Sequence, residues 1–162
     1  MSVTRHISDD AQGAADSCAA FIAAALRQEL AASPVATLAV SGGSTPRLMF
    51  DALEIEPLDW TRIHVFFVDE RPVPPGDPAS NFTLCETHLL TPAAVPAASV
   101  HRILAERGPA VAAALYSADI TLFFQEFTGE NPRFTVVQCL SLIHISGLVR
   151  TTSQHDQGLC IQ

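Results

Sequence analysis

Residues 35–53 of the chain read VATLAVSGGSTPRLMFDAL. The opening run, residues 35–40, is short, apolar and partly β-branched, which predicts a buried strand. Residues 41–44 form a glycine-rich turn. Thr45 and Pro46 then resemble a helix N-cap followed by proline at the first helical position, where its missing N–H costs nothing. The stretch therefore predicts a strand, a tight turn and a helix in immediate succession.

The same alternation continues on both sides of this stretch. Apolar residues recur every three or four positions over residues 10–30, which predicts a helix before the first strand. Further along, we expect strands at residues 63–68, 100–104 and 134–140 and helices at residues 81–90 and 109–127. Elements that alternate in this way predict an α/β fold: a mostly parallel, open sheet with helices on both faces, as in Rossmann-like proteins.

Composition restricts the class of partner. The chain has 162 residues, of which 48% are hydrophobic and 16% are charged, as is typical of one globular domain. Its net charge of −8 argues against nonspecific binding to nucleic acid or to an anionic membrane, because both need a basic patch. The sequence contains neither an apolar stretch of about 18 residues nor a secretory signal. We therefore expect a cytoplasmic protein with small-molecule partners and with no nucleic-acid or membrane partner.

The turn at residues 41–45 is the first candidate site. Glycines let a ligand approach the backbone closely, and the N–H groups and dipole of a helix N-terminus favour an anion such as phosphate. The hydroxyls of Ser41, Ser44 and Thr45 would add donors. The alternative is a tight strand-to-helix turn without a ligand, because such turns are common and neither the GxGxxG nor the P-loop motif is present.

Asp69, Glu70 and Arg71 form the second candidate site, at the end of the second expected strand. Because the carboxyl ends of parallel strands share one edge, these side chains should open onto the same pocket as the first turn. An arginine can hold an anionic oxygen through two N–H bonds, and a carboxylate can orient water or a hydroxyl group. The alternative is a solvated turn with a surface ion pair.

The histidines and cysteines show no catalytic or metal-binding pattern. His64 lies inside an expected strand, which favours a core residue over a general base. His88 and His101 have no evident acidic or hydroxyl partner, and neither a Ser/His/Asp order nor a nucleophile elbow is present. The four cysteines lack the spacing of a zinc site or a disulfide framework, so we expect no metal.

Two motifs together resemble a known family. SGGSTP at residues 41–46 and VDERPVPPGDPASN at residues 68–81 are similar, in order and separation, to motifs of the 6-phosphogluconolactonase family. The resemblance extends from the N-terminal helix to about Cys139. The related glucosamine-6-phosphate deaminases are less similar, because they carry a different glycine turn and an acidic-acidic-tyrosine segment in place of residues 69–71.

The resemblance implies a carboxylic ester hydrolase that converts 6-phosphoglucono-1,5-lactone to 6-phosphogluconate in the pentose phosphate pathway, without a metal or organic cofactor. Its small-molecule partner would be this phosphosugar lactone. The resemblance also implies that the 6-phosphate is cradled by Gly42, Gly43, Ser44 and Thr45. The sugar acid would lie near Arg71, which is supported by Asp69 and Glu70, with Asn81 close by.

The chain changes character near Cys139. No alanine follows Ala118, no proline follows Pro132, and the glycine-rich segment in which the family carries its water-activating histidine is absent. His144 lies near that position without the family's neighbouring residues, so we do not transfer the role and leave the catalytic residue unassigned. We expect residues 1–139 to be the N-terminal part of a 6-phosphogluconolactonase-like domain, residues 140–162 to be a tail foreign to it, and this chain to be a truncated, inactive fragment.

Two other functions stay open. A noncatalytic phosphosugar-binding module would keep the phosphate turn and bind 6-phosphogluconate without hydrolysing a lactone. A glucosamine-6-phosphate deaminase or isomerase would instead release ammonia from glucosamine 6-phosphate.

Overall fold

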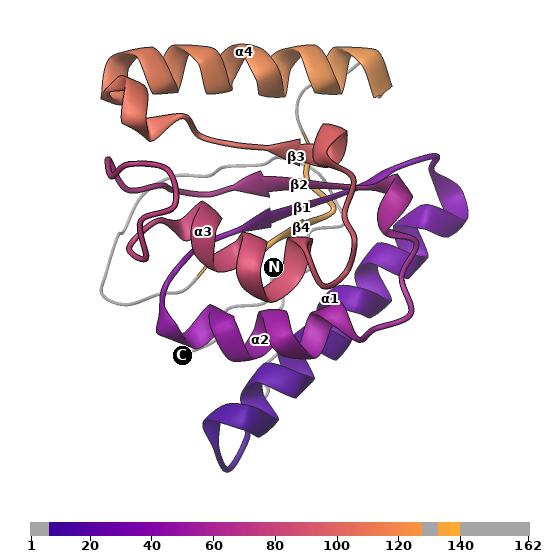
Figure 1. Ribbon diagram of the computed structural model, residues 1–162. Coiled ribbons are helices and arrows are strands. Elements are labelled where there is room, and N and C mark those ends of the chain that lie inside the picture. Colours follow the sequence, from indigo (N-terminus) through magenta and orange to yellow (C-terminus); the bar gives the residue numbers. More distant parts are fainter. Residues whose placement is uncertain (1–6, 128–132, 140–162) are drawn as a thin grey trace.

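A four-stranded parallel sheet forms the centre of the molecule. The computed structural model describes residues 7–127 and 133–139 (Figure 1). The strands are β1 (Ala36–Val40), β2 (Ile63–Phe67), β3 (Val100–His101) and β4 (Val136–Val137), in the order β3-β2-β1-β4. All three neighbouring pairs are parallel.

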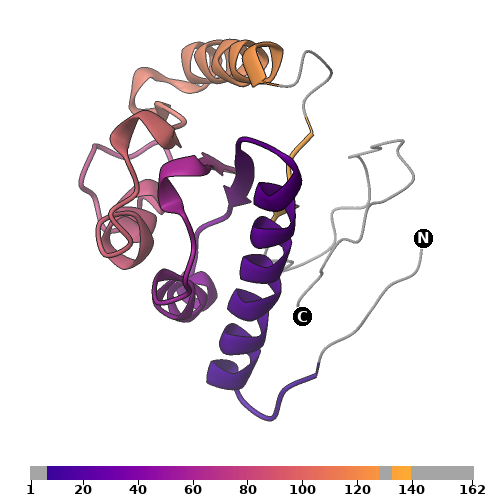
Figure 2. The same ribbon diagram turned by 90° about the vertical axis from the view of Figure 1, so that its right-hand side faces the viewer.

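Helices cover both faces of the sheet. One face carries α1 (Ala11–Ala32), α2 (Ser44–Glu54) and α3 (Asn81–Cys85), which continues as a π-helical turn, η2 (Glu86–Leu90). The other face carries α4 (Pro109–Phe127), which lies above the sheet (Figures 1 and 2). Short 3₁₀ turns link the remaining elements: η1 (Trp60–Arg62), η3 (Ala97–Ser99) and η4 (Ala105–Arg107). The predicted α/β fold with a parallel sheet and helices on both faces is confirmed.

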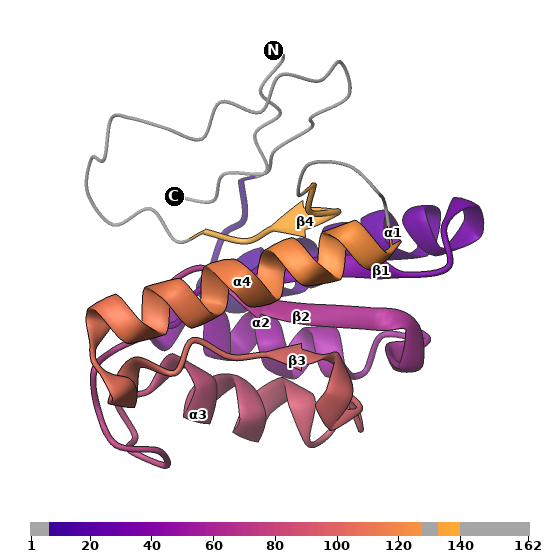
Figure 3. The ribbon, with the colours of Figure 1, turned by 90° about the horizontal axis from the view of Figure 1, so that it is seen from above.

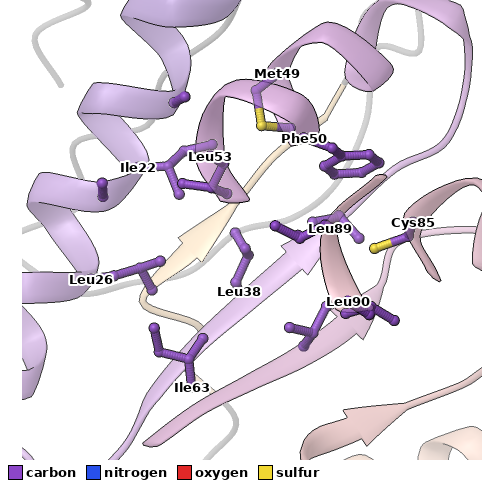
Figure 4. Packing of buried hydrophobic residues seen from close by; sticks show 14 of the residues in the cluster. Ile22, Leu26, Leu38, Met49, Phe50, Leu53, Ile63, Cys85, Leu89 and Leu90 are labelled. Carbon is purple, nitrogen blue, oxygen red and sulfur yellow. The ribbon is translucent and has the colours of Figure 1, made fainter. Parts of the chain in front are cut away.

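The main core lies between the sheet and α1, α2 and η2. Leu26 of α1, Leu38 of β1, Phe50 of α2 and Leu89 of η2 have no exposed surface, and their side chains converge in Figure 4. Burying a side chain of this size stabilises a fold by about 1.5–3 kcal/mol. All five residues of β1 are buried, because both faces of this strand are covered.

A second, aromatic cluster lies beneath α4. Phe66 of β2 packs against Phe123 and Phe124 of α4, with ring centroids 5.2 Å and 6.1 Å away, and against Phe134, at 5.1 Å. Seen from above, α4 lies lengthwise over the strands (Figure 3). This cluster fixes the helix to the sheet.

The order of the strands places a topological switch point beside β1. The chain first extends the sheet on one side of β1, through β2 and β3, and then returns through α4 to the other side as β4. In open α/β sheets, ligands bind beyond the carboxyl ends of the strands at such a point. The turn after β1 occupies this position.

Three expected boundaries differ from the structure. Thr45 is not the N-cap of α2: Gly43 takes that place with φ 120°, and Ser44 is already helical. Glycine adopts this φ far more readily than other residues do. The chain can therefore enter the helix directly after Gly43. The strands at residues 100–104 and 134–140 are shorter than expected, because β3 and β4 each pair at two residues; residue 140 lies outside the described part.

Candidate functional site

Three segments leave the sheet side by side at its carboxyl edge. Val40 at the end of β1 is in register with Phe67 at the end of β2, and the Val40 carbonyl accepts a hydrogen bond from the Val68 N–H at 2.8 Å. On the other side of β1, the N–H of Gln138 donates to the Ala39 carbonyl at 2.8 Å. The segments that follow β1, β2 and β4 therefore begin together.

The turn after β1 is fixed by Gln138. The buried side chain of Gln138 accepts hydrogen bonds through Oε1 from the Ser41 N–H, at 3.0 Å, and from Ser41 Oγ, at 3.3 Å. The sequence did not predict this contact between Ser41 and Gln138. The one available signal was a glutamine directly after an apolar strand at the switch point.

The N-cap residue of the helix that begins at this turn is Gly43, and no side-chain capping bond is found there in the described part of the chain. Ser44 is the first helical residue and Thr45 is exposed, while Pro46 carries no N–H group. Because the backbone N–H groups of a first helical turn have no partner within the helix, an uncapped N-terminus favours an anion through both hydrogen bonds and the helix dipole.

Gly42 and Asn81 are in direct contact. A Cβ atom added at Gly42 would overlap with Oδ1 and Cγ of Asn81 and would lie 2.8 Å from its Cβ. Asn81 is the first residue of α3 and is 3% exposed. The glycine turn and the start of α3, far apart in the sequence, thus pack directly against each other.

Hydrogen bonds connect the side chain of Glu70 to the start of α3. Its Oε1 accepts from the backbone N–H groups of Arg71, at 2.7 Å, and Asn81, at 2.8 Å. Its Oε2 accepts from Ser80 Oγ at 3.0 Å and from the Phe82 N–H at 2.9 Å. Ser80 in turn caps α3 by accepting from the Thr83 N–H at 3.2 Å.

Asp69 and Arg71 point outward. Both are exposed, and neither side chain makes an ion pair or a hydrogen bond with any residue in 7–127 or 133–139. The backbone carbonyl of Asp69 accepts from Asn81 Nδ2 at 3.0 Å. The guanidinium of Arg71 is therefore available to an anionic ligand, against the unfavourable net charge of −8.

An arginine after β3 lies beside α3. The guanidinium carbon of Arg102 is 4.0 Å from the ring centroid of Phe82, and Nε of Arg102 is buried without a hydrogen-bond partner in the described part of the chain. Sequence reasoning did not select Arg102, because the contact joins two segments that no local pattern connects.

The histidines are paired away from this edge. His64 Nδ1 lies 3.0 Å from His101 Nε2, and His101 Nδ1 lies 2.9 Å from Asp119 Oδ2 on α4. Burial lowers the pKa of His64 from 6.5 to about 4, with a smaller contribution from His101. His64 lies within β2 as expected, but it is half-buried rather than part of the core. The expectation that His88 and His101 lack acidic partners is wrong, because His88 contacts Asp51 at 2.8 Å and His101 contacts Asp119.

The remaining expectations concern metals, membranes and the tail. Within residues 7–127 and 133–139, no cluster of three His, Cys, Asp or Glu side chains could hold a metal ion. None of the helices in that same part is long and apolar enough to cross a membrane. His144 and the expected tail at residues 140–162 lie outside the described residues.

Comparisons with known proteins identify relatives of this chain. A 6-phosphogluconolactonase of Nostoc sp. is 40% identical over 102 residues, covering 62% of this chain and 42% of that protein. One of Treponema pallidum is 37% identical over 142 residues, covering 86% and 54%. The chain therefore spans about half the length of the curated relatives it matches.

A solved structure shows the same fold. The 6-phosphogluconolactonase of Thermotoga maritima superposes with a TM-score of 0.70 at 24% identity, covering 75% of this chain and 55% of that chain. In addition, the sequence model of glucosamine-6-phosphate isomerases and 6-phosphogluconolactonases matches residues 9–139, which include both motifs and every strand. This match shows that the chain belongs to the glucosamine-6-phosphate isomerase/6-phosphogluconolactonase family.

Proposed function

We propose that this chain is the phosphosugar-binding part of a 6-phosphogluconolactonase, a cytoplasmic hydrolase of the pentose phosphate pathway. The observation that carries the proposal is the contact between Gly42 and Asn81, which joins the glycine turn to the segment that bears Arg71. The names of the Nostoc and Treponema pallidum relatives favour this member of the family over the isomerases.

The two halves of the site would bind the two ends of the substrate. The 6-phosphate would lie at the turn formed by Gly42, Gly43, Ser44 and Thr45, where the N-terminus of α2 is uncapped. The exposed guanidinium of Arg71 would attract the oxygens at the acid end, with Asp69 beside it. Local donors would thus hold an anion that the net charge repels.

The reaction itself needs a proton acceptor. Water attacks the C1 carbonyl of the lactone, the bond from C1 to the ring oxygen breaks, and that oxygen takes up a proton as the sugar hydroxyl while the acid loses one. We assign no general base, because the sequence lacks the segment in which the family carries its histidine. This chain of 162 residues should therefore bind the product without hydrolysing the lactone.

The extent of the domain is part of the proposal. We propose that residues 1–139 are the N-terminal part of the family domain and that residues 140–162 are foreign to it. The loss of alanine after Ala118 and of proline after Pro132 supports this division, as does the end of the family match at residue 139. The uninterrupted gene tests it: a continuation after codon 139 that encodes a DGH-type segment is expected, and its absence would count against both the division and the activity.

Calorimetric titration with 6-phosphogluconate tests the binding function. We expect binding that weakens by about tenfold or more in Arg71→Ala, because charge-assisted hydrogen bonds contribute about 1.5–3 kcal/mol each. Arg27→Ala is the matched control, since Arg27 lies on α1 near the opposite edge of the sheet, in a half-exposed ion pair with Glu56. Gluconate, which lacks the phosphate, should bind far more weakly.

Two results would overturn the proposal. One is the absence of any heat of binding from folded protein, and the other is release of ammonia from glucosamine 6-phosphate by the complete gene product. Lactone hydrolysis by that complete product, measured through coupled reduction of a nicotinamide cofactor by 6-phosphogluconate dehydrogenase, is the expected positive outcome.

A further inference from the structure

The carboxylate of Glu70 connects the turn after β2 to the start of α3. It accepts four hydrogen bonds, of 2.7 to 3.0 Å, from Arg71, Ser80, Asn81 and Phe82. Three of the donors are backbone N–H groups, so the contact does not depend on the choice of side chain at those positions. The long proline-rich loop between residues 71 and 80 is closed at its base by this one group.

These contacts use the acceptor capacity of the carboxylate. Two carboxylate oxygens offer about four acceptor positions, and each oxygen of Glu70 already receives two donors. No lone pair is left for a sugar hydroxyl or a water molecule. Glu70 therefore differs from its neighbours Asp69 and Arg71, which are exposed.

The same contacts determine where Asn81 lies. The backbone N–H of Asn81 donates to Glu70 Oε1, and its Nδ2 donates to the Asp69 carbonyl at 3.0 Å. Its side chain contacts Gly42. A chain of contacts thus runs from Glu70 through Asn81 to the glycine turn. Loss of the first contact should release the last.

We propose that Glu70 is a positioning residue, which seats Asn81 on the glycine turn and so aligns the two halves of the phosphosugar site, and that it makes no contact with the substrate itself. This inference rests on the proposed function for its effect on binding, but its structural part can be tested without any ligand.

Glutamine is the informative replacement because it keeps the size and removes the acceptor pattern. In Glu70→Gln, the NH₂ group of the amide must face one of the two sets of donors. At least one backbone N–H then points at another N–H and loses its acceptor. A residue that contacted substrate hydroxyls would tolerate this change well, since an amide can donate to a hydroxyl as well as accept from it.

Amide hydrogen exchange of the unliganded protein is the first measurement. In Glu70→Gln we expect the N–H groups of Asn81 and Phe82 to exchange at least about tenfold faster than in the wild type, since a lost charge-assisted bond corresponds to a tenfold change or more in local opening. Glu126→Gln, an exposed change on α4, is the matched control and should leave this exchange unchanged. Unchanged exchange in Glu70→Gln would overturn the proposal.

A double-substitution cycle with 6-phosphogluconate is the second measurement. If Glu70 acts through Asn81, Glu70→Gln alone should weaken 6-phosphogluconate binding by about tenfold. The same substitution added to Asn81→Ala should weaken it by less than about twofold. Equal, additive losses in the two backgrounds would mean that Glu70 contacts the ligand directly and would overturn the proposal. The fluorescence of Trp60, the one tryptophan, shows whether each variant is folded.

The two proposals can fail separately. If the wild-type protein binds no 6-phosphogluconate, the proposed function fails, while amide exchange still decides whether Glu70 holds Asn81. If the wild type binds 6-phosphogluconate, and Glu70→Gln shows the same amide exchange rates and the same affinity as the wild type, only the positioning role is refuted.

Discussion

The side chain of Asn81 lies against Gly42, in the space that any Cβ at position 42 would occupy. Gly42 is not among the glycines with positive φ, so its backbone conformation is open to other residues. The requirement for glycine at this position is therefore one of space, imposed by a residue from another segment of the chain.

Gly42→Ala should destabilise the protein by about 1–3 kcal/mol, the usual cost of inserting a methyl group where there is no room. Urea unfolding followed by Trp60 fluorescence measures the change. The same variant should lose 6-phosphogluconate binding, because the turn and α3 are forced apart.

The loss should depend on Asn81. In an Asn81→Gly background, which removes the overlapping atoms, Gly42→Ala should cost little further stability. Gly76→Ala serves for comparison, since Gly76 has φ +83° and nothing within 4 Å, so its cost comes from the backbone and is independent of Asn81. An unchanged cost of Gly42→Ala in both backgrounds would contradict the steric explanation.

Tyr116 completes the hydrogen bonding of β2. Its hydroxyl donates to the Phe67 carbonyl at 2.8 Å and accepts from the Phe67 N–H at 2.8 Å. Because β3 pairs only with Val65 and Phe66, Phe67 has no strand partner on that side within residues 7–127 and 133–139. Tyr116 is a residue of α4 whose hydroxyl faces the sheet, and burial there raises its pKa to about 12.

Tyr116→Phe should therefore cost about 2 kcal/mol of the free energy of unfolding, because it leaves both polar groups of Phe67 unpaired. Urea denaturation measures this, with Ser117→Ala at a neighbouring exposed position as the control. A stability within about 0.5 kcal/mol of the wild type would show that water satisfies Phe67 equally well.

The parts of the fold with local signals could be predicted from the sequence. The strand, turn and helix at residues 35–53 and the extent of α4 follow from composition and spacing over a few residues. Glu70 was expected to line the pocket, yet its bonds to Ser80, Asn81 and Phe82 span ten to twelve residues and depend on how the proline-rich loop closes. Gln138 reaches Ser41 across 97 residues. Such contacts arise from tertiary packing, which no local periodicity encodes.

Arg62 caps the end of α1 from a distance. Its guanidinium donates to the carbonyls of Leu30 at 3.0 Å, Ser33 at 2.6 Å and Pro34 at 2.8 Å, which end the helix and lead into β1. The planar fork of an arginine can reach several carbonyls at once, whereas a lysine ammonium on a single stem cannot hold all of them.

Arg62→Lys should accordingly destabilise the protein by about 1–3 kcal/mol in spite of the conserved charge. Thermal unfolding followed by circular dichroism measures the change. Arg27→Lys, in the half-exposed ion pair with Glu56, is the matched control and should change stability by less than about 1 kcal/mol. Equal effects of the two substitutions would show that charge alone matters at Arg62.

The final prediction concerns acid. His64 of β2 faces His101 of β3 at 3.0 Å, and the rings of Phe123 and Phe127 on α4 pack against it with centroids 4.5 Å and 5.5 Å away. Asp119 of α4 is the charged group that faces this pair, through His101 at 2.9 Å. Burial is the main reason that the pKa of His64 falls from 6.5 to about 4.

A histidine with a lowered pKa in the folded state is stabilising while it stays neutral. Its contribution is complete above its unfolded pKa of 6.5 and is lost as the pH falls toward its folded value of about 4, because the unfolded chain then binds the proton more readily. We therefore expect the urea midpoint of the wild type to fall over this window. In His64→Leu, which cannot take up the proton, the fall should be smaller. Parallel pH profiles for the two proteins would show that other groups account for the acid sensitivity and that the contacts of His64 with α4 do not depend on its charge.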